Sequence, residues 1–229
     1  MKKIIAITVI LLAGFNLWAQ ETKIEKSEFD LIMGDSFKAI RNQPYRTIEI
    51  SESQNFAGTT KTKIITERLG ANSRTIYEFD SPGMSSKNEA IFFNGRRFKR
   101  NLEKSWIEET TEIKPSAPSI YETLSNEILY YSLGDKISDE KNFKVYKTVE
   151  NRKQLNKERG DESEWHIVTT FWFDQSGLLV KKERLMELTM KPKKLETDTF
   201  VRKETKVITK SLSTTEIDPS IKIEAPQIG

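Results

Sequence analysis

The sequence predicts an exported α+β protein built on an antiparallel sheet of about ten strands with two amphipathic helices. Three observations lead to this prediction. The first nineteen residues have the form of a secretory signal peptide, most later segments alternate apolar and polar residues, and two segments have apolar residues at helical spacing. No internal repeat and no linker-like segment interrupts residues 20–229, so we expect them to form one domain.

The signal peptide sets the expected compartment. Lys2 and Lys3 supply its charged start, and the apolar run 4–15 is too short to cross a bilayer as a permanent helix. Ala19 is a small residue at the expected cleavage site, so the mature chain would begin at Gln20. An uncleaved membrane anchor is the alternative, because Leu17 is less usual at the third position before the cut. Either way, we expect the protein to work in the periplasm.

Composition excludes several classes of protein. The chain has no cysteine, so disulfides and a lipid-modified cysteine are excluded, and we expect a soluble protein. The formal net charge of +3 includes Lys2 and Lys3, so the mature chain is nearly neutral. A net basic face for nucleic acid is therefore not expected.

The first helix is predicted over 27–42. Phe29, Ile32, Met33, Phe37 and Ile40 recur at three- and four-residue spacing, Ser27-x-x-Asp30 is its start signal, and Pro44 ends it. Alternating segments then predict antiparallel strands over 45–51, 62–69, 74–79, 89–93, 96–100 and 105–109.

The strongest local signal is Asn94-Gly95, a dipeptide that favours a two-residue hairpin turn. The turn predicts that Phe93 faces Arg96, Phe92 faces Arg97, Ile91 faces Phe98 and Glu89 faces Arg100. Ile91, Phe93 and Phe98 would then share one side of the sheet. Residues 96–100 interleave cations with an aromatic ring, which indicates either a contact with lipid phosphates or simply an exposed hairpin strand.

A second helix is predicted over 119–133. Ser119-x-x-Glu122 forms a capping box, Ile120, Leu124, Ile128 and Tyr131 form an apolar stripe, and Gly134 fits its end. Strands are expected again over 143–150, 165–173, 178–190 and 199–210, with a turn at 174–177 and a short closing strand within 218–226.

No motif names a reaction, so we expect no catalytic residue, no metal site and no cofactor. His166 is the only histidine, and alternation places it with Thr170 and Trp172, opposite Trp165, Ile167, Phe171 and Phe173. The carboxylate pairs lack the spacing of a calcium loop, and the glycines lack a phosphate-loop spacing.

The order of these features resembles the periplasmic lipoprotein-carrier superfamily, LolA and LolB and the outer-membrane lipoprotein-sorting proteins. The resemblance rests on the signal peptide, the first helix ending in 42–45, the run of hairpins, the segment after Pro118, the sequence 173–181 and the tail 218–226. It implies a strongly curved antiparallel half-barrel, open along one side, whose concave face is covered by helices and holds acyl chains. The acidic insertion around 158–164 departs from the carriers.

The expected function is therefore a non-enzymatic carrier that shields a lipid or lipoprotein acyl chain or another amphiphile. If the sheet curves, the lining of a hydrophobic cavity is expected to be Ile91, Phe93, Phe98, Ile120, Leu124, Ile128, Trp165, Ile167, Phe171, Phe173 and Val180. An ordinary packed core is the alternative. A second functional hypothesis is a sensor or interaction domain that binds an envelope protein without lipid. We expect a monomer, with transient membrane contact and no nucleic-acid partner.

Overall fold

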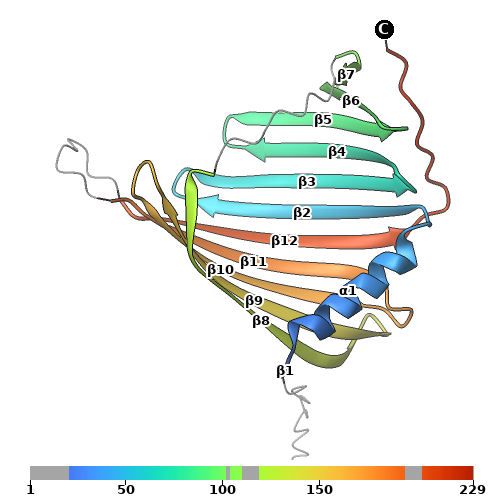
Figure 1. Ribbon diagram of the computed structural model, residues 1–229. Coiled ribbons are helices and arrows are strands. Elements are labelled where there is room, and N and C mark those ends of the chain that lie inside the picture. Colours follow the sequence, from blue (N-terminus) through green and yellow to red (C-terminus); the bar gives the residue numbers. More distant parts are fainter. Residues whose placement is uncertain (1–20, 102–103, 110–118, 194–202, 229) are drawn as a thin grey trace, which may run out of the picture.

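The computed structural model describes residues 21–101, 104–109, 119–193 and 203–228 (Figure 1). The predicted signal peptide lies outside these residues. One sheet of twelve antiparallel strands dominates the fold, and its order is β1-β8-β9-β10-β11-β12-β2-β3-β4-β5-β6-β7. The strands are β1 (Thr22–Ile24), β2 (Tyr45–Asn55), β3 (Gly58–Leu69), β4 (Asn72–Ser81), β5 (Met84–Phe93), β6 (Arg96–Asn101), β7 (Ile107–Glu109), β8 (Tyr121–Ser138), β9 (Lys141–Asn156), β10 (Glu162–Phe173), β11 (Leu179–Lys191) and β12 (Thr205–Ile217).

The sheet is open, because β1 and β7 are its edges and do not pair with each other. Figure 1 shows that it is also twisted, so that β8, β9 and β10 run at an angle to β3, β4 and β5. Both edge strands have only three residues.

Helix α1 (Lys26–Ile40) is the one helix among the described residues, and it connects an edge of the sheet with its middle. It leaves β1 beside β8 and leads to β2 beside β12, so the strands from β8 to β12 lie between its ends. From β8 to β12, five strands about 4.8 Å apart span about 19 Å. A helix of 15 residues is about 22 Å long and is therefore suited to this crossing.

The prediction of this helix is confirmed, although its start differs. Glu25 precedes it and makes no side-chain cap, while Lys26 and Asp30 form an ion pair across its first turn. Phe29 and Ile40 are buried, as their spacing predicts, but Phe37 is 61% exposed. The buried stripe of α1 is thus narrower than the apolar pattern.

The twelve strands give the sheet two faces, which we name by what covers them. The helix face carries Tyr146 and Phe171, whose rings contact Phe29 of α1. The tail face carries Ile91 and Phe98, which form a buried cluster with Ile221 and Ile223 of the C-terminal segment. Directly opposed residues of neighbouring strands share a face. From Phe171 the helix face can be followed through Lys182, Ser213, Glu49, Ile64, Tyr77, Asn88 and Asn101.

The predicted second helix is wrong, because residues 121–138 form strand β8. This strand pairs with β9 along its length and with β1 near its middle. Residues four apart share a face of a strand as well as of a helix, so the apolar spacing did not distinguish the two. The register shifts between Thr123 and Ser125, which makes Leu124 an extra residue. Gly134 has a φ of 68° at a second register shift rather than after a helix. Ser119 does not cap a helix, since its hydroxyl accepts a hydrogen bond from the Tyr121 N–H at 3.2 Å.

The remaining strand predictions agree with the structure in position and differ in length. The hairpin register around Asn94 and Gly95 is confirmed pair by pair. Gly177, with a φ of 82°, lies in the predicted turn after β10. The expected strand 199–210 begins partly outside the described residues and continues as β12 to Ile217. The expected closing strand is wrong, because residues 221–228 follow the tail face as irregular backbone held by Ile221 and Ile223.

Candidate functional site

Under α1, the helix face is filled by aromatic rings. Phe29 lies 5.3 Å from Tyr130 and 5.1 Å from Phe171, measured between ring centroids, and Tyr146 lies 5.7 Å from Phe173. Tilted and edge-on pairs at these distances are stabilising. Burial in this cluster raises the pKa of the Tyr146 hydroxyl. Ser36 fixes the far half of the helix, since its hydroxyl accepts a 2.8 Å hydrogen bond from the Leu179 N–H.

Beyond α1, the helix face continues as an open apolar zone, which consists of Trp165, Ile167, Met186, Leu188 and Val207. Trp165 faces Leu188, which faces Val207, and Ile167 faces Met186 on the next row. Ile167 is 3% exposed, whereas the other four side chains are half-buried. Figure 1 shows that α1 lies near the other ends of these strands, beside the turn that joins β10 to β11. The open apolar zone thus covers three strands, and the row of Thr169, Arg184 and Ser211 separates it from the aromatic cluster.

Two donors at the margin of this zone lack acceptors. Arg152 directly faces Trp165, and its guanidinium carbon lies 5.0 Å from the Trp165 ring centroid. The Nε of Arg152 and the Nε1 of Trp165 are both shielded from solvent and donate to no acceptor in the described chain. A shielded donor without an acceptor costs about 1–3 kcal/mol. The nearest carboxylate oxygen to Arg152 Nε belongs to Glu150, at 3.7 Å, beyond hydrogen-bonding distance.

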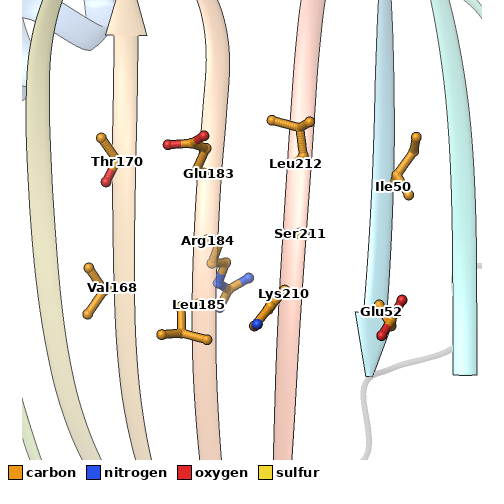
Figure 2. A pocket seen from close by; sticks show the side chains of 10 residues that line it. All are labelled: Ile50, Glu52, Val168, Thr170, Glu183, Arg184, Leu185, Lys210, Ser211 and Leu212. Carbon is orange, nitrogen blue, oxygen red and sulfur yellow. The ribbon is translucent and has the colours of Figure 1, made fainter. Parts of the chain in front are cut away.

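The tail face has a hollow of about 420 Å³ over β10, β11, β12 and β2. Figure 2 shows its side chains in two rows that follow the register, one of Thr170, Glu183, Leu212 and Ile50 and one of Val168, Leu185, Lys210 and Glu52. Leu212 is 39% and Ile50 is 52% exposed. The hollow is therefore an aliphatic surface with both signs of charge on it.

Towards β6, the tail face carries a row of alternating charges. Arg46 contacts Glu67 at 2.8 Å, Arg74 contacts Glu67 at 3.7 Å and Glu89 at 2.6 Å, and Arg100 contacts Glu89 at 2.7 Å. Glu89 is 2% exposed. Burial alone would raise the pKa of the Glu89 carboxyl, but the hydrogen bonds from Arg100 and Arg74 outweigh it and hold this pKa below its usual value. The row ends where Arg100 lies over the Trp106 ring.

The residues predicted to line one cavity are divided between the two faces. Ile91, Phe93 and Phe98 lie on the tail face with the C-terminal segment. Ile128, Trp165, Ile167, Phe171 and Phe173 lie on the helix face, as the registers from β8 to β11 require. Ile120 and Leu124 are 40% and 46% exposed, and Val180 is a half-buried extra residue at a register shift. The structure thus brings five of these side chains to one face.

Sequence analysis missed several residues of the two faces. Met186 and Leu188 lie within the predicted strand 178–190, and their alternation with Glu187 was a usable signal. Ile221 and Ile223 show the same alternation, but they pack without pairing in the sheet. No sequence pattern marks Arg152, because its contact with Trp165 depends on how β9 and β10 pair.

The polar candidates from the sequence have ordinary partners. His166 is exposed, and its Nδ1 lies 2.7 Å from Asn151 Oδ1. Arg96, Arg97 and Lys99 pair with Glu108 or Glu109, which favours the exposed-hairpin interpretation over a free cationic surface. Within the described ranges, no group of three or more His, Asp or Glu side chains is placed to hold a metal ion. No described helix is long and apolar enough to span a bilayer.

Comparison with known proteins gives structural similarity only. No protein-family model and no curated protein sequence matches the chain. Similar solved structures include a DUF1329 family protein from Desulfovibrio piger, with 11% identity, 88% of this chain and 96% of that chain covered, and a TM-score of 0.31. They also include an outer membrane lipoprotein-sorting protein domain from Vibrio parahaemolyticus, with 11% identity, 84% and 93% covered, and a TM-score of 0.30.

Proposed function

We propose that the protein is an exported, non-enzymatic binding protein that shields an acyl chain or another amphiphile in the periplasm. The mature chain, residues 20–229, would act as one domain. One observation carries the proposal: a sheet of twelve strands has a single described helix over one face. Stable domains bury each apolar sheet face against a second layer. Over the open apolar zone, that second layer would be the ligand.

The helix face offers the better surface for an acyl chain. Trp165, Leu188 and Val207 form one uninterrupted apolar row on it. An alkyl chain on this row would remove apolar area from water, worth about 25 cal/mol per Å² before the costs of binding. A carrier function is favoured over catalysis because His166, the one imidazole, lies on the opposite face and bonds to Asn151.

The test begins with exported protein purified without detergent and extracted into organic solvent. Mass spectrometry should find a co-purifying lipid, and N-terminal sequencing should begin at or near Gln20. The protein should also bind a fluorescent fatty acid, and Leu188→Asp should weaken that binding by about tenfold or more, because a charge would enter the apolar row. Leu212→Asp, on the tail face, is the matched control and should bind normally. Absence of both bound lipid and probe binding would refute the carrier function.

The second candidate, a protein-binding domain of the same fold, is favoured by the hollow on the tail face. Its exposed Leu212 and Ile50 adjoin Glu183, Glu52 and Lys210, and an apolar centre with a charged rim is typical of protein interfaces. Under this function, Leu212→Asp would abolish capture of an envelope protein, while Leu188→Asp would not. The two substitutions therefore separate the two functions.

A further inference from the structure

Arg152 and Trp165 have an arrangement that the fold alone does not explain. They face each other across β9 and β10, the guanidinium lies over the indole ring, and one shielded N–H of each has no acceptor among the described residues. Shielded donors in native proteins nearly always have a partner. Here both unpartnered donors adjoin the same apolar row, so a ligand that covers this row would bring its polar end to them.

We propose that Arg152 and Trp165 bind the carbonyl oxygen that adjoins the acyl chain of the amphiphile. This proposal rests on the proposed function and specifies the chemical class of its ligand. The chain would lie along Trp165, Leu188 and Val207. The two N–H groups, shielded from water in the free protein, would turn so that Arg152 Nε and Trp165 Nε1 donate hydrogen bonds to the oxygen. Such an oxygen occurs in a fatty acid, in an ester and in an N-acyl group.

The charge near these donors bears on which of those sources fits best. Glu150 lies two residues from Arg152 on the same face, with Oε1 3.7 Å from Nε. Its carboxylate balances the guanidinium charge and would repel a second carboxylate. The surroundings therefore favour a neutral carbonyl, as in an ester or amide, over an ionised fatty acid.

The test compares ligands of equal chain length by displacement of a naturally fluorescent polyene fatty acid. The ligands are a fatty acid methyl ester, the free acid and the alkane, which has no acceptor. Trp165→Phe removes one donor and keeps the ring, and Arg152→Met removes the other and keeps the length of the side chain. Arg184→Met, an exposed arginine of the same face, is the matched control.

We expect Trp165→Phe to weaken binding of the ester about three- to tenfold and Arg152→Met to weaken it about tenfold or more. Neither substitution should change binding of the alkane, and Arg184→Met should change neither ligand. In the native protein the ester should displace the probe at a lower concentration than the free acid. If the free acid is instead the stronger competitor, the ligand class is an ionised acid and the assignment of a neutral carbonyl is overturned.

If the substitutions weaken binding of the ester and of the alkane equally, the two side chains only support the apolar surface. If they leave binding of the ester unchanged, the two side chains do not touch the ligand. Either result overturns the head-group assignment and leaves the carrier function standing. Failure of the native protein to bind the probe, the ester and the alkane would instead remove the carrier function itself. Thermal unfolding of each variant shows whether it is folded, and Trp165→Phe decides the question if Arg152→Met is not.

Discussion

Arg100 donates two hydrogen bonds to one carboxylate oxygen of Glu89, from Nε at 2.9 Å and from Nη2 at 2.7 Å. The other oxygen of Glu89 accepts a 2.6 Å hydrogen bond from Arg74 Nε. A carboxylate that is nearly inaccessible to water therefore holds cations from both neighbouring strands, β4 and β6. This arrangement ties three strands near the edge of the sheet, beside the buried cluster of Ile91 and Phe98.

Glu89→Gln should lower the free energy of unfolding by about 1–3 kcal/mol, because it removes the charge that Arg74 and Arg100 share. Urea unfolding followed by circular dichroism measures the change. Glu78→Gln is the matched control, since Glu78 pairs with the well-exposed Lys87 and should cost at most about 1 kcal/mol. Equal losses in the two variants would show that the buried position of Glu89 adds nothing.

Acid should destabilise the protein through the same carboxylate. The folded pKa of Glu89 lies below the ordinary glutamate value of 4.5, so its contribution to stability is complete above that value and is lost as the pH falls through the folded pKa. The melting temperature should decline as the pH is lowered below about 4.5. Glu89→Gln should show a smaller decline over that range, and an unchanged acid profile would contradict the assignment.

The C-terminal segment should contribute to stability through two side chains. Ile221 is 6% exposed against Ile91 and Phe98, so Ile221→Ala should cost about 2–5 kcal/mol. Ile228, which is 50% exposed, is the control and its alanine variant should unfold like the native protein. Chemical denaturation checks both variants. A neutral Ile221→Ala would mean that the segment does not pack on the tail face in solution.

Gly95→Ala should destabilise the β5–β6 hairpin by about 1–2 kcal/mol, because an alanine resists the left-handed region. The φ of Gly95 is 79°, and a Cβ there would meet no atom within 4 Å, so the cost lies in the backbone alone. Gly34→Ala is the opposite control. Gly34 lies in α1 with equally open surroundings, and its substitution should stabilise the protein by about 0.5–1 kcal/mol. The melting temperature of Gly95→Ala should fall below that of the native protein, and the melting temperature of Gly34→Ala should rise above it.

The sequence predicted a structural feature correctly where the residues that determine it are neighbours in the chain, and failed where they are far apart. The hairpin register followed from Asn94 and Gly95 alone, because a tight turn determines the pairs on either side of it. Residues 121–138 were misassigned, because a capping box and four-residue spacing are local, whereas the pairing with β9 and the extra residue Leu124 are not. Local pattern and tertiary pairing conflicted there, and the pairing decided the structure.

The division of the predicted lining residues between two faces has a similar cause. Alternation along β10 correctly separates Trp165 and Ile167 from His166. Whether Ile91 shares the face of Phe171 depends on the registers of all the strands between them, from β10 through β11, β12, β2, β3 and β4 to β5. A shift of one residue in any of these pairs would exchange the faces. Such a relationship is visible only in the assembled sheet.

The seam between β2 and β12 has a consequence for the order of folding. The strands from β2 to β7 and those from β8 to β12 are two meanders of consecutive neighbours, and each can form from short-range contacts. Their junction pairs Tyr45 with Ile217, which lie far apart in the sequence. Pairings between distant segments are slow because the loop must close first. A chain that emerges N-terminus first would therefore hold the unpaired edge of β2 until its last strand arrives, and during that interval it would depend on chaperones to avoid aggregation.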